Sequence, residues 1–281
     1  HGLRELRQRP APAPWNDIML REIASLLRCD LTLIISEFEV DWLRNNTPVD
    51  DVLLHYLPFL LDPVEPAWPG FEQREHFITI GNFRHPPNWD AIRYMKETLW
   101  PLIRTSCPEA ELHVYGAYPP PKATQLDHPA TGFRVRGWAD DVDEVMRRHR
   151  VCLAPLRFGA GLKGKLADAM RNGTPNVTTG IGAEGMAGNL PWSGHIENEP
   201  EAFACAAVEL YRDGEAWHEA QNNGLEIVNQ RFDRASHGEA LIQRLTDLPQ
   251  NRPVHFLGAL LRHHTLKSSM YMARWIEAKN R

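Results

Sequence analysis

Glycines and lysines gather in the segment APLRFGAGLKGKLADAM, which covers residues 154–170. An apolar run precedes the glycines and a helical pattern follows them, so backbone N–H groups and the positive end of a helix dipole converge at one point that favours phosphate. Arg157, Lys163 and Lys165 add positive charge. Asp168 stands one helical turn further on, where a carboxylate accepts hydrogen bonds from ribose hydroxyls. The segment therefore predicts a nucleotide-diphosphate site.

Two other interpretations start from the same glycines. Gly159, Gly164 and Lys165 fit the GxxxxGK pattern of a P-loop, which would indicate an ATPase or GTPase. Leu166 stands where a P-loop has the Ser or Thr that holds magnesium, and the loop follows a late strand, so we do not adopt this interpretation. Alternatively, the glycines only permit a tight turn from strand to helix.

The elements that must hold this segment alternate between strand and helix, as in a parallel sheet. The predicted strands cover residues 77–80, 111–115, 133–135, 151–156 and 176–179, and the helices between them include residues 90–103 and 165–172. Five strands with crossover helices indicate a doubly wound α/β domain.

A second, smaller α/β region precedes this sheet. A helix is predicted over residues 16–28, and strands over residues 31–35 and 52–57. Ser36 and Glu39 have the spacing of a capping box that opens a helix over residues 37–44.

Residues that break helices and strands precede the segment of the large sheet, and long helical patterns follow it. Prolines and a glycine are dense between residues 61 and 73, which predicts a linker between domains. Residues 200–245 are amphipathic with helical spacing, and residues 255–279 predict a further long helix or a helix pair.

Composition and charge exclude several classes of protein. The net charge is −5 with Lys and Arg dispersed, so the footprint of a nucleic-acid binder is absent. No apolar run reaches the roughly 18 to 20 residues of a membrane span. The four cysteines form no CxxC pair, which favours a reducing, cytoplasmic compartment, and three of them have apolar surroundings that predict buried thiols. No His or carboxylate spacing along the chain indicates a metal site.

The chain resembles a known family over residues 77–190. The runs FITIGNFRHPPNWDAI, LHVYGAYPP and VRGWADDVDEVMRRHRVCLAPLRFGAGLKGKLADAMRNGTPNVTTGIGAEGM, in this order, are similar to the donor domain of the group-1 (GT4-type) glycosyltransferases. The resemblance implies an α/β, GT-B-like fold of two Rossmann-like domains with parallel sheets, of which the N-terminal one is incomplete.

This resemblance also implies a division of the chain. Residues 1–62 would be the C-terminal part of the acceptor-side domain, 63–76 the linker, 77–250 the donor-binding domain, and 251–281 helices that pack back on the N-terminal domain. Because the sequence begins with His1 instead of Met, we expect an upstream part to be missing.

The donor site is carried over residue by residue. Gly81 matches the glycine that ends the first strand of the family's donor domain. Asn82 and Asn88 stand where relatives carry a basic pair that grips the pyrophosphate, so Arg84 or Lys163 is expected to supply the charge. Arg84 fits a solvated loop residue equally well.

Two acids eight residues apart are typical of the family. Asp168, in the run Asp168-Ala169-Met170, matches the second acid, and Ala160 replaces the first. Backbone amides of Ala160, Gly161 and Leu162 are expected to substitute for that acid.

The remaining site residues come from other loops. Gly137 matches the loop beside the nucleobase, whereas the adjacent Trp138 is interpreted as a packing residue. Gly182, Ala183 and Glu184 match a loop that flanks the nucleotide or sugar, although Glu184 fits a helix cap equally well. His1 resembles a histidine that lines the cleft, and with Lys163 and Asp168 it completes the predicted catalytic set.

The resemblance implies a hexosyltransferase that moves sugar from a UDP-, GDP- or dTDP-sugar to an acceptor, with retention of configuration and without metal or cofactor. The acceptor stays open among a glycan, a lipid-linked glycan and a protein. The expected setting is polysaccharide biosynthesis in the cytoplasm, including peripheral association with the inner membrane face, and the oligomeric state is open. Two alternatives remain: a sugar-nucleotide epimerase of the same fold, and a degenerate donor-binding scaffold.

Overall fold

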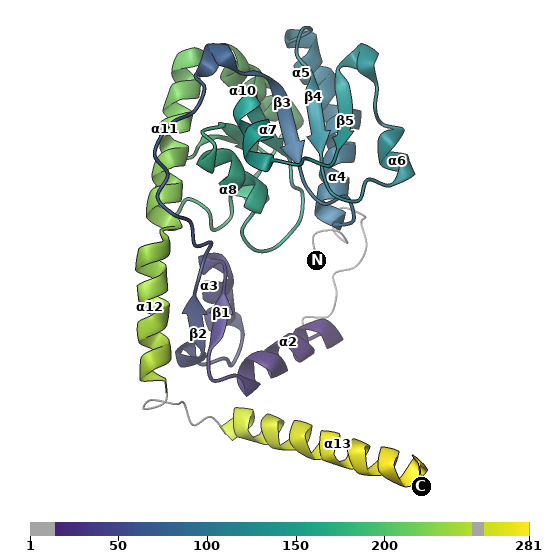
Figure 1. The fold of residues 1–281 in the computed structure, drawn as a ribbon, viewed down its shortest axis with the longest axis vertical. Coiled ribbons are helices and arrows are strands. Elements are labelled where there is room, and N and C mark those ends of the chain that lie inside the picture. The colour runs from purple at the N-terminus through teal and green to yellow at the C-terminus, as the bar shows by residue number, and fades with distance from the viewer. Residues whose placement is uncertain (1–14, 249–255, 281) are drawn as a thin grey trace. The chain divides into compact units, whose positions relative to one another are not determined.

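The computed structural model describes residues 15–248 and 256–280 and divides into two compact units (Figure 1). The first unit covers residues 59–234. The second combines residues 11–58 with residues 235–281, of which 15–58, 235–248 and 256–280 are described. The predicted domain boundaries stay a prediction.

The first unit is built on a six-stranded parallel sheet. Its strands are β3 (Glu75–Ile80), β4 (Leu112–Tyr115), β5 (Phe133–Gly137), β6 (His149–Ala154), β7 (Asn176–Thr178) and β8 (Gly194–Ile196), in the spatial order β5-β4-β3-β6-β7-β8. Numbered within the sheet, this order is 3-2-1-4-5-6, the doubly wound arrangement of dinucleotide-binding domains. The predicted α/β class with parallel sheets is confirmed. The sixth strand was not predicted, because β8 has three residues and begins with a glycine.

Helices cover both faces of this sheet. They are α4 (Pro86–Tyr94), α5 (Trp100–Ser106), α6 (Pro121–Thr124), α7 (Val142–Arg148), α8 (Gly164–Arg171), α9 (Gly180–Ala183), α10 (Pro200–Arg212) and α11 (Gly214–Arg231). Alternate strand residues point to opposite faces. Phe77 of β3 therefore packs with residues of α5 and α10, whereas its neighbour Ile78 packs with residues of α7 and α8.

The helix predicted over residues 90–103 is interrupted in the structure. A π-helical turn, Met95–Leu99, separates α4 from α5. Pro101 lies in the first turn of α5, and a proline there has no N–H to donate to the carbonyl four residues earlier and its ring crowds that carbonyl. The widened turn accommodates Pro101, while Met95, Leu99 and Trp100 stay buried in the core.

Arg74 lies fully buried just before β3. Its Nε donates to the Pro69 carbonyl at 2.9 Å, its Nη1 to Thr174 Oγ1 at 2.8 Å and its Nη2 to the Asn172 carbonyl at 2.9 Å. The guanidinium carbon lies 5.2 Å from the centre of a Trp217 ring. Burial, followed by the charge of Arg147, lowers the pKa of Arg74 to about 10, and the group stays charged at neutral pH.

The second unit contains a short parallel pair of strands, β1 (Thr32–Ile34) and β2 (Leu54–Tyr56), and the helices α2 (Asp17–Arg28), α3 (Glu37–Asn46), α12 (Arg234–Asp247) and α13 (Phe256–Asn280). Its core includes Ile23, Leu27, Val40 and Leu43. The helix over residues 255–279 is a single one among the described residues. Arg262 Nη1 of α13 donates to Asp30 Oδ1 at 2.9 Å.

The predicted capping box of α3 is wrong. Ser36 occupies the N-cap position, but its side chain makes no capping hydrogen bond. Its Oγ is buried and has no hydrogen-bond partner among the described residues. The sequence spacing was suitable, but the box also requires the side chains of Ser36 and Glu39 to turn toward the helix end.

The cysteines are free thiols, of which Cys107 and Cys152 are buried and Cys29 and Cys205 are exposed. The prediction of three buried thiols is therefore wrong for one of them: Cys29 directly follows the last residue of α2, and Cys205 lies within α10 on its exposed side. Within residues 15–248 and 256–280, none of the helices has the length and apolarity needed to cross a membrane.

Candidate functional site

A pocket of about 310 Å³ lies where the winding of the sheet reverses, at the carboxyl ends of β3 and β6. Strand order changes direction between these two strands, so the connections leaving them diverge and open a crevice. Gly81 follows β3, and Leu156 and Phe158 follow β6. Such a crevice is where open α/β sheets bind ligands.

The glycines of the predicted loop have backbone conformations that other residues rarely adopt. Gly159 has φ +145° and Gly161 has φ +69°. The loop can therefore turn sharply between β6 and α8, which brings Gly159, Ala160 and Leu162 to the pocket wall. The tight-turn interpretation is correct as far as it goes, and the turn also shapes a pocket.

Helix α8 begins at this pocket. Its N-cap residue, Lys163, makes no side-chain cap to the helix, and Gly164, Lys165 and Asp168 line the cavity. The amides of a first helical turn have no partner within the helix, and they carry the positive end of the helix dipole. An anion in the pocket would meet these amides.

Lys165 supplies the ammonium group of this site. Its Nζ donates to Asn88 Oδ1 at 2.8 Å, across the pocket from α8 to α4. Burial lowers the pKa of Lys165 to about 8, opposed by the nearby Cys152 thiol. An amine with few partners in a pocket gains most from an added anion, because the anion restores the stabilisation of charge that burial removed.

Lys163 and Asp168 also line the pocket, with different surroundings. Lys163 Nζ donates to the Gly161 carbonyl, so its charge is turned onto its own loop. Burial raises the pKa of Asp168, Arg171 at 3.5 Å opposes that shift, and Asp143 adds to it. The carboxyl group of Asp168 therefore tends to keep its proton more than an exposed aspartate does.

Gly81 leaves room for the Asn88 side chain. A Cβ at this position would lie 2.7 Å from Asn88 Nδ2. Asn88 donates to the Asn82 carbonyl at 3.1 Å while it accepts from Lys165. The missing side chain of Gly81 thus lets Asn88 stand where it can orient Lys165.

Six predicted residues lie together at the pocket: Gly81, Gly159, Ala160, Leu162, Lys163 and Asp168. Arg157 is not among the lining residues, because Asp90 holds the Nε–Nη2 edge of its guanidinium, at 2.9 and 2.7 Å. Arg84 is exposed, outside the lining, and its guanidinium carbon lies 4.2 Å from the centre of the Tyr118 ring.

The other predicted residues lie outside the pocket wall. Gly161 belongs to the loop but does not line the cavity, and Asn82 accepts from the backbone of Arg84. Gly137, Gly182, Ala183 and Glu184 lie beyond it, on the β5 end and in or after α9. His1 lies outside the described residues.

Trp138 does not pack as predicted. Its side chain is 67% exposed at the end of β5, next to Gly137 with φ +76°. The chain turns there, so the ring leaves the sheet instead of joining the core.

Several lining residues were not predicted as site residues: His85, Pro87, Asn88, Val142, Phe158 and Lys165. Lys165 was predicted to add charge near the phosphate and was noted in the P-loop pattern, but it was not assigned a contact, and Asn88 was noted only as a replacement for a basic residue. The strand order could have identified them, because residues that follow β3 and β6 meet at the switch point, where the strand order reverses.

Comparison with known proteins gives the family. The model of the family described as glycosyl transferases group 1 matches residues 74–213, and these residues form a domain of this family. A Klebsiella pneumoniae protein described as an uncharacterized 44.6 kDa protein in the cps region is 23% identical over 217 residues, which cover 73% of this chain and 53% of that protein. The predicted family is confirmed, whereas its GT4 subtype stays a prediction.

Solved glycosyltransferase structures share the fold. TarM of S. aureus, whose complex contains UDP, superposes with a TM-score of 0.68 at 12% identity, covering 83% of this chain and 48% of TarM. HepE of Anabaena, in complex with UDP and glucose, superposes with a TM-score of 0.65 at 13% identity, covering 87% of this chain and 73% of HepE. Both likenesses support the GT-B glycosyltransferase fold. The chain spans about half the length of the Klebsiella protein and of TarM.

Proposed function

We propose that the protein transfers a sugar from a nucleotide-diphosphate sugar to an acceptor, with the diphosphate held at the switch-point pocket. One observation carries the proposal: Lys165 and the uncapped start of α8 line the same pocket at the carboxyl ends of β3 and β6. Backbone amides and an ammonium group at one pocket can together bind the two phosphates of a diphosphate.

The same groups provide a mechanism. When the glycosidic bond breaks, negative charge grows on the leaving diphosphate. The helix amides and Lys165 already point to that place, so they stabilise the charge without rearrangement. Positive charge from the protein takes the part that a metal ion plays in other transferases, and we propose transfer with retention of configuration, as the family resemblance implies.

Asp168 has a separate part in this proposal. It lies one turn inside α8 and lines the pocket with a raised pKa. A carboxyl group there contacts sugar or ribose hydroxyls, either as acceptor or, when protonated, as donor. Sugar hydroxyls present both functions, so Asp168 is suited to hold the sugar in one orientation.

The donor base and the setting are proposed more narrowly than the sequence allowed. UDP is bound in the complexes of TarM and HepE, which supports a UDP-sugar over GDP- and dTDP-sugars. The free cysteines support a reducing, cytoplasmic setting, and association with the membrane surface remains part of the proposal.

Calorimetry with UDP, GDP and dTDP tests donor binding first. We expect the tightest binding for UDP and weaker UDP binding in the Lys165→Met variant; no heat from any nucleotide would remove the proposed function. Incubation with a panel of UDP-hexoses, with and without sugar acceptors, then tests the chemistry. Acceptor-dependent release of UDP supports transfer, whereas an altered sugar with donor alone would identify an epimerase.

A further inference from the structure

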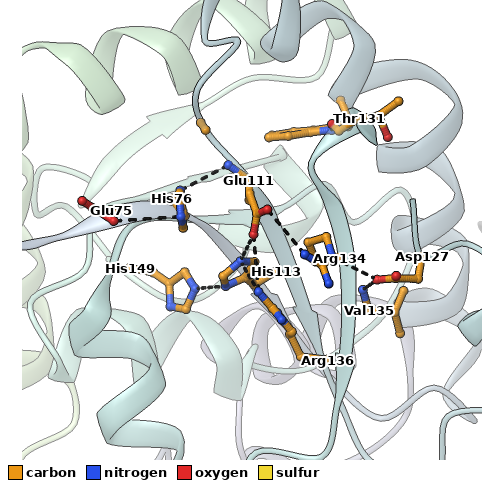
Figure 2. Close-up of polar contacts among 12 residues, drawn as sticks. Glu75, His76, Glu111, His113, Asp127, Thr131, Arg134, Val135, Arg136 and His149 are labelled. Carbon is orange, nitrogen blue, oxygen red and sulfur yellow. Dashed lines mark hydrogen bonds and ion pairs between the residues drawn. The ribbon is translucent and has the colours of Figure 1, made fainter. Parts of the chain in front are cut away.

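A cluster of histidines and charged residues lies at the other end of the strands from the pocket, where the parallel strands begin. His76 is the second residue of β3, Glu111 precedes β4, His113 is the second residue of β4 and His149 is the first of β6. All four therefore lie at the amino ends of parallel strands. Figure 2 shows their side chains turned toward one another.

Three of these residues have metal-ligating atoms close together. One such atom from each of His76, Glu111 and His113 lies within 4.8 Å of the other two. No spacing along the chain indicated this set, because its residues are neighbours only across two paired strands. Two imidazoles and one carboxylate are a ligand set that zinc uses when it keeps a further position open.

His113 is held in the orientation that a ligand needs. Its Nδ1 lies 2.7 Å from His149 Nε2, and His149 Nδ1 lies 2.5 Å from the Val145 carbonyl. A carbonyl only accepts, so His149 donates from Nδ1 and accepts at Nε2, which makes His113 the donor from Nδ1. Nε2 of His113 faces the cluster and lies 2.7 Å from Glu111 Oε2. Both atoms carry lone pairs in this tautomer, so a proton joins them when no cation is bound, and a cation takes the place of that proton. Histidines in metal sites likewise donate their other N–H to a second group.

His76 adds a second nitrogen from a strained position. Its φ is +61°, in the left-handed region that only a few non-glycine residues adopt. Its Nδ1 accepts from the Glu111 amide at 3.2 Å, so the ring proton is on Nε2, which faces Glu75 Oε2 at 4.0 Å. The lone pair of Nδ1 is thus used by the Glu111 backbone amide, and a cation bound at Nδ1 would replace this hydrogen bond, with the Glu75 carboxylate behind the ring.

Two arginines of β5 face the same carboxylate. Arg136 Nη2 lies 3.1 Å from His113 Nε2 and 3.4 Å from Glu111 Oε2, and Arg134 Nη1 lies 3.5 Å from Glu111 Oε1. The side chain of Arg136 is 37% exposed, so it can withdraw into solvent. A cation that enters the cluster must displace the Arg136 guanidinium and overcome the charge of both arginines.

We propose that His76, Glu111 and His113 form a site for a borderline divalent cation of the zinc class, at which the Arg136 guanidinium competes with the ion. The lone pairs of His113 Nε2 and His76 Nδ1 and one Glu111 oxygen are the ligands. His149 and Glu75 orient the two rings from behind. The ion takes over the contacts of Arg136 and joins the amino ends of β3 and β4.

The test titrates Zn²⁺ into the metal-stripped full chain against a chromogenic chelator, with Co²⁺ absorption reporting on nitrogen and oxygen ligation. We expect one equivalent of Zn²⁺ per chain. His76→Asn is the sharpest variant, because asparagine tolerates a positive φ and leaves the backbone unchanged. It should weaken Zn²⁺ binding by about tenfold or more, the range for disturbing such sites.

Arg136→Met should change the Zn²⁺ affinity in the opposite direction. Removing one competing charge should tighten Zn²⁺ binding by about tenfold or more. His195→Asn is the matched control. His195 is a half-buried histidine of β8 that lies beside Glu209 of α10, outside the cluster. Thermal unfolding in chelator verifies that each variant is folded.

Unchanged affinity in His76→Asn, no tightening in Arg136→Met, or an equal loss in His195→Asn would each overturn the assignment. Absence of Zn²⁺ binding in both the unaltered chain and Arg136→Met would do the same.

Discussion

Lys165 Nζ and Asn88 Oδ1 lie 2.8 Å apart, although the two residues are separated by 77 positions in the chain. Lys165 comes from α8 and Asn88 from α4, so the bond joins the two elements that leave the switch point. Asn88 occupies a position where the family resemblance led us to expect a basic residue. The structure brings the positive charge to that place from α8 instead.

Replacing Lys165 with Met should weaken UDP binding by about 1.5 to 3 kcal/mol, the range for hydrogen bonds to a charged group. Calorimetry measures the change. Lys122→Met is the control, since Lys122 is exposed over Trp89 and lies outside the pocket lining. Lys163→Ala should cost less than Lys165→Met, because Lys163 is turned onto the Gly161 carbonyl; the reverse order would contradict our view of the site.

UDP affinity should fall as pH rises above about 8. Burial lowers the pKa of Lys165 to about 8, so the ammonium that holds the diphosphate is fully present below that pH and is lost above it. The terminal phosphate of UDP titrates lower, near a pKa of about 6, and does not interfere. Calorimetry between pH 7 and 9 is the measurement.

The arginine variant isolates the cause of this pH dependence. Arg stays protonated at every pH of the titration. Lys165→Arg should therefore remove the decline above pH 8, whatever its affinity at pH 7. A decline of the same steepness in the variant would assign the titration to another group.

Substitution of Gly161 by Ala should destabilise the protein by about 1 to 2 kcal/mol, the cost of a side chain in the left-handed region. Gly161 has φ +69°. Gly164→Ala is the matched control, since a Cβ there meets nothing within 4 Å and its φ is not in that region. Urea unfolding should show Gly164→Ala equal to or above the unaltered protein in stability; equal losses in both variants would contradict the backbone argument.

Leu166→Ser restores the P-loop pattern at the position that argued against it. Leu166 is fully buried in the cluster around Ile227 and Phe232. The variant should lose about 2 to 5 kcal/mol of unfolding free energy, as for other large losses from a core, and gain no ATP hydrolysis. Urea unfolding and a phosphate-release assay measure both effects, and a stable, ATP-hydrolysing variant would reinstate the P-loop interpretation.

The alternation of strands and helices was predictable because it depends on local periodicity. Every predicted strand of the large sheet is present, and so is the loop of Gly159 and Gly161 between β6 and α8. What failed depends on partners distant in sequence. Arg157 lies in the loop as predicted, but Asp90 holds one edge of its guanidinium, and no local pattern couples positions 67 residues apart.

The same limit explains why the capping box prediction was wrong and why the cluster of His76, Glu111 and His113 was not predicted. Ser36 and Glu39 have the correct spacing, yet side-chain rotamers decide whether a box forms. His76, Glu111 and His113 stand next to each other only because β3 and β4 pair in one register. Register depends on both strands of a pair, so the sequence of one strand alone does not predict it.

The hydrogen bonds of Arg74 imply how the larger unit comes apart. Its acceptors belong to residues 69, 172 and 174, so the charge is satisfied only when segments from both halves of the sheet are in place. A partly opened unit would leave that charge buried without acceptors, which is costly. We therefore expect the unit to open cooperatively, with the amides of β3, β6 and β7 exchanging their hydrogens at a common rate.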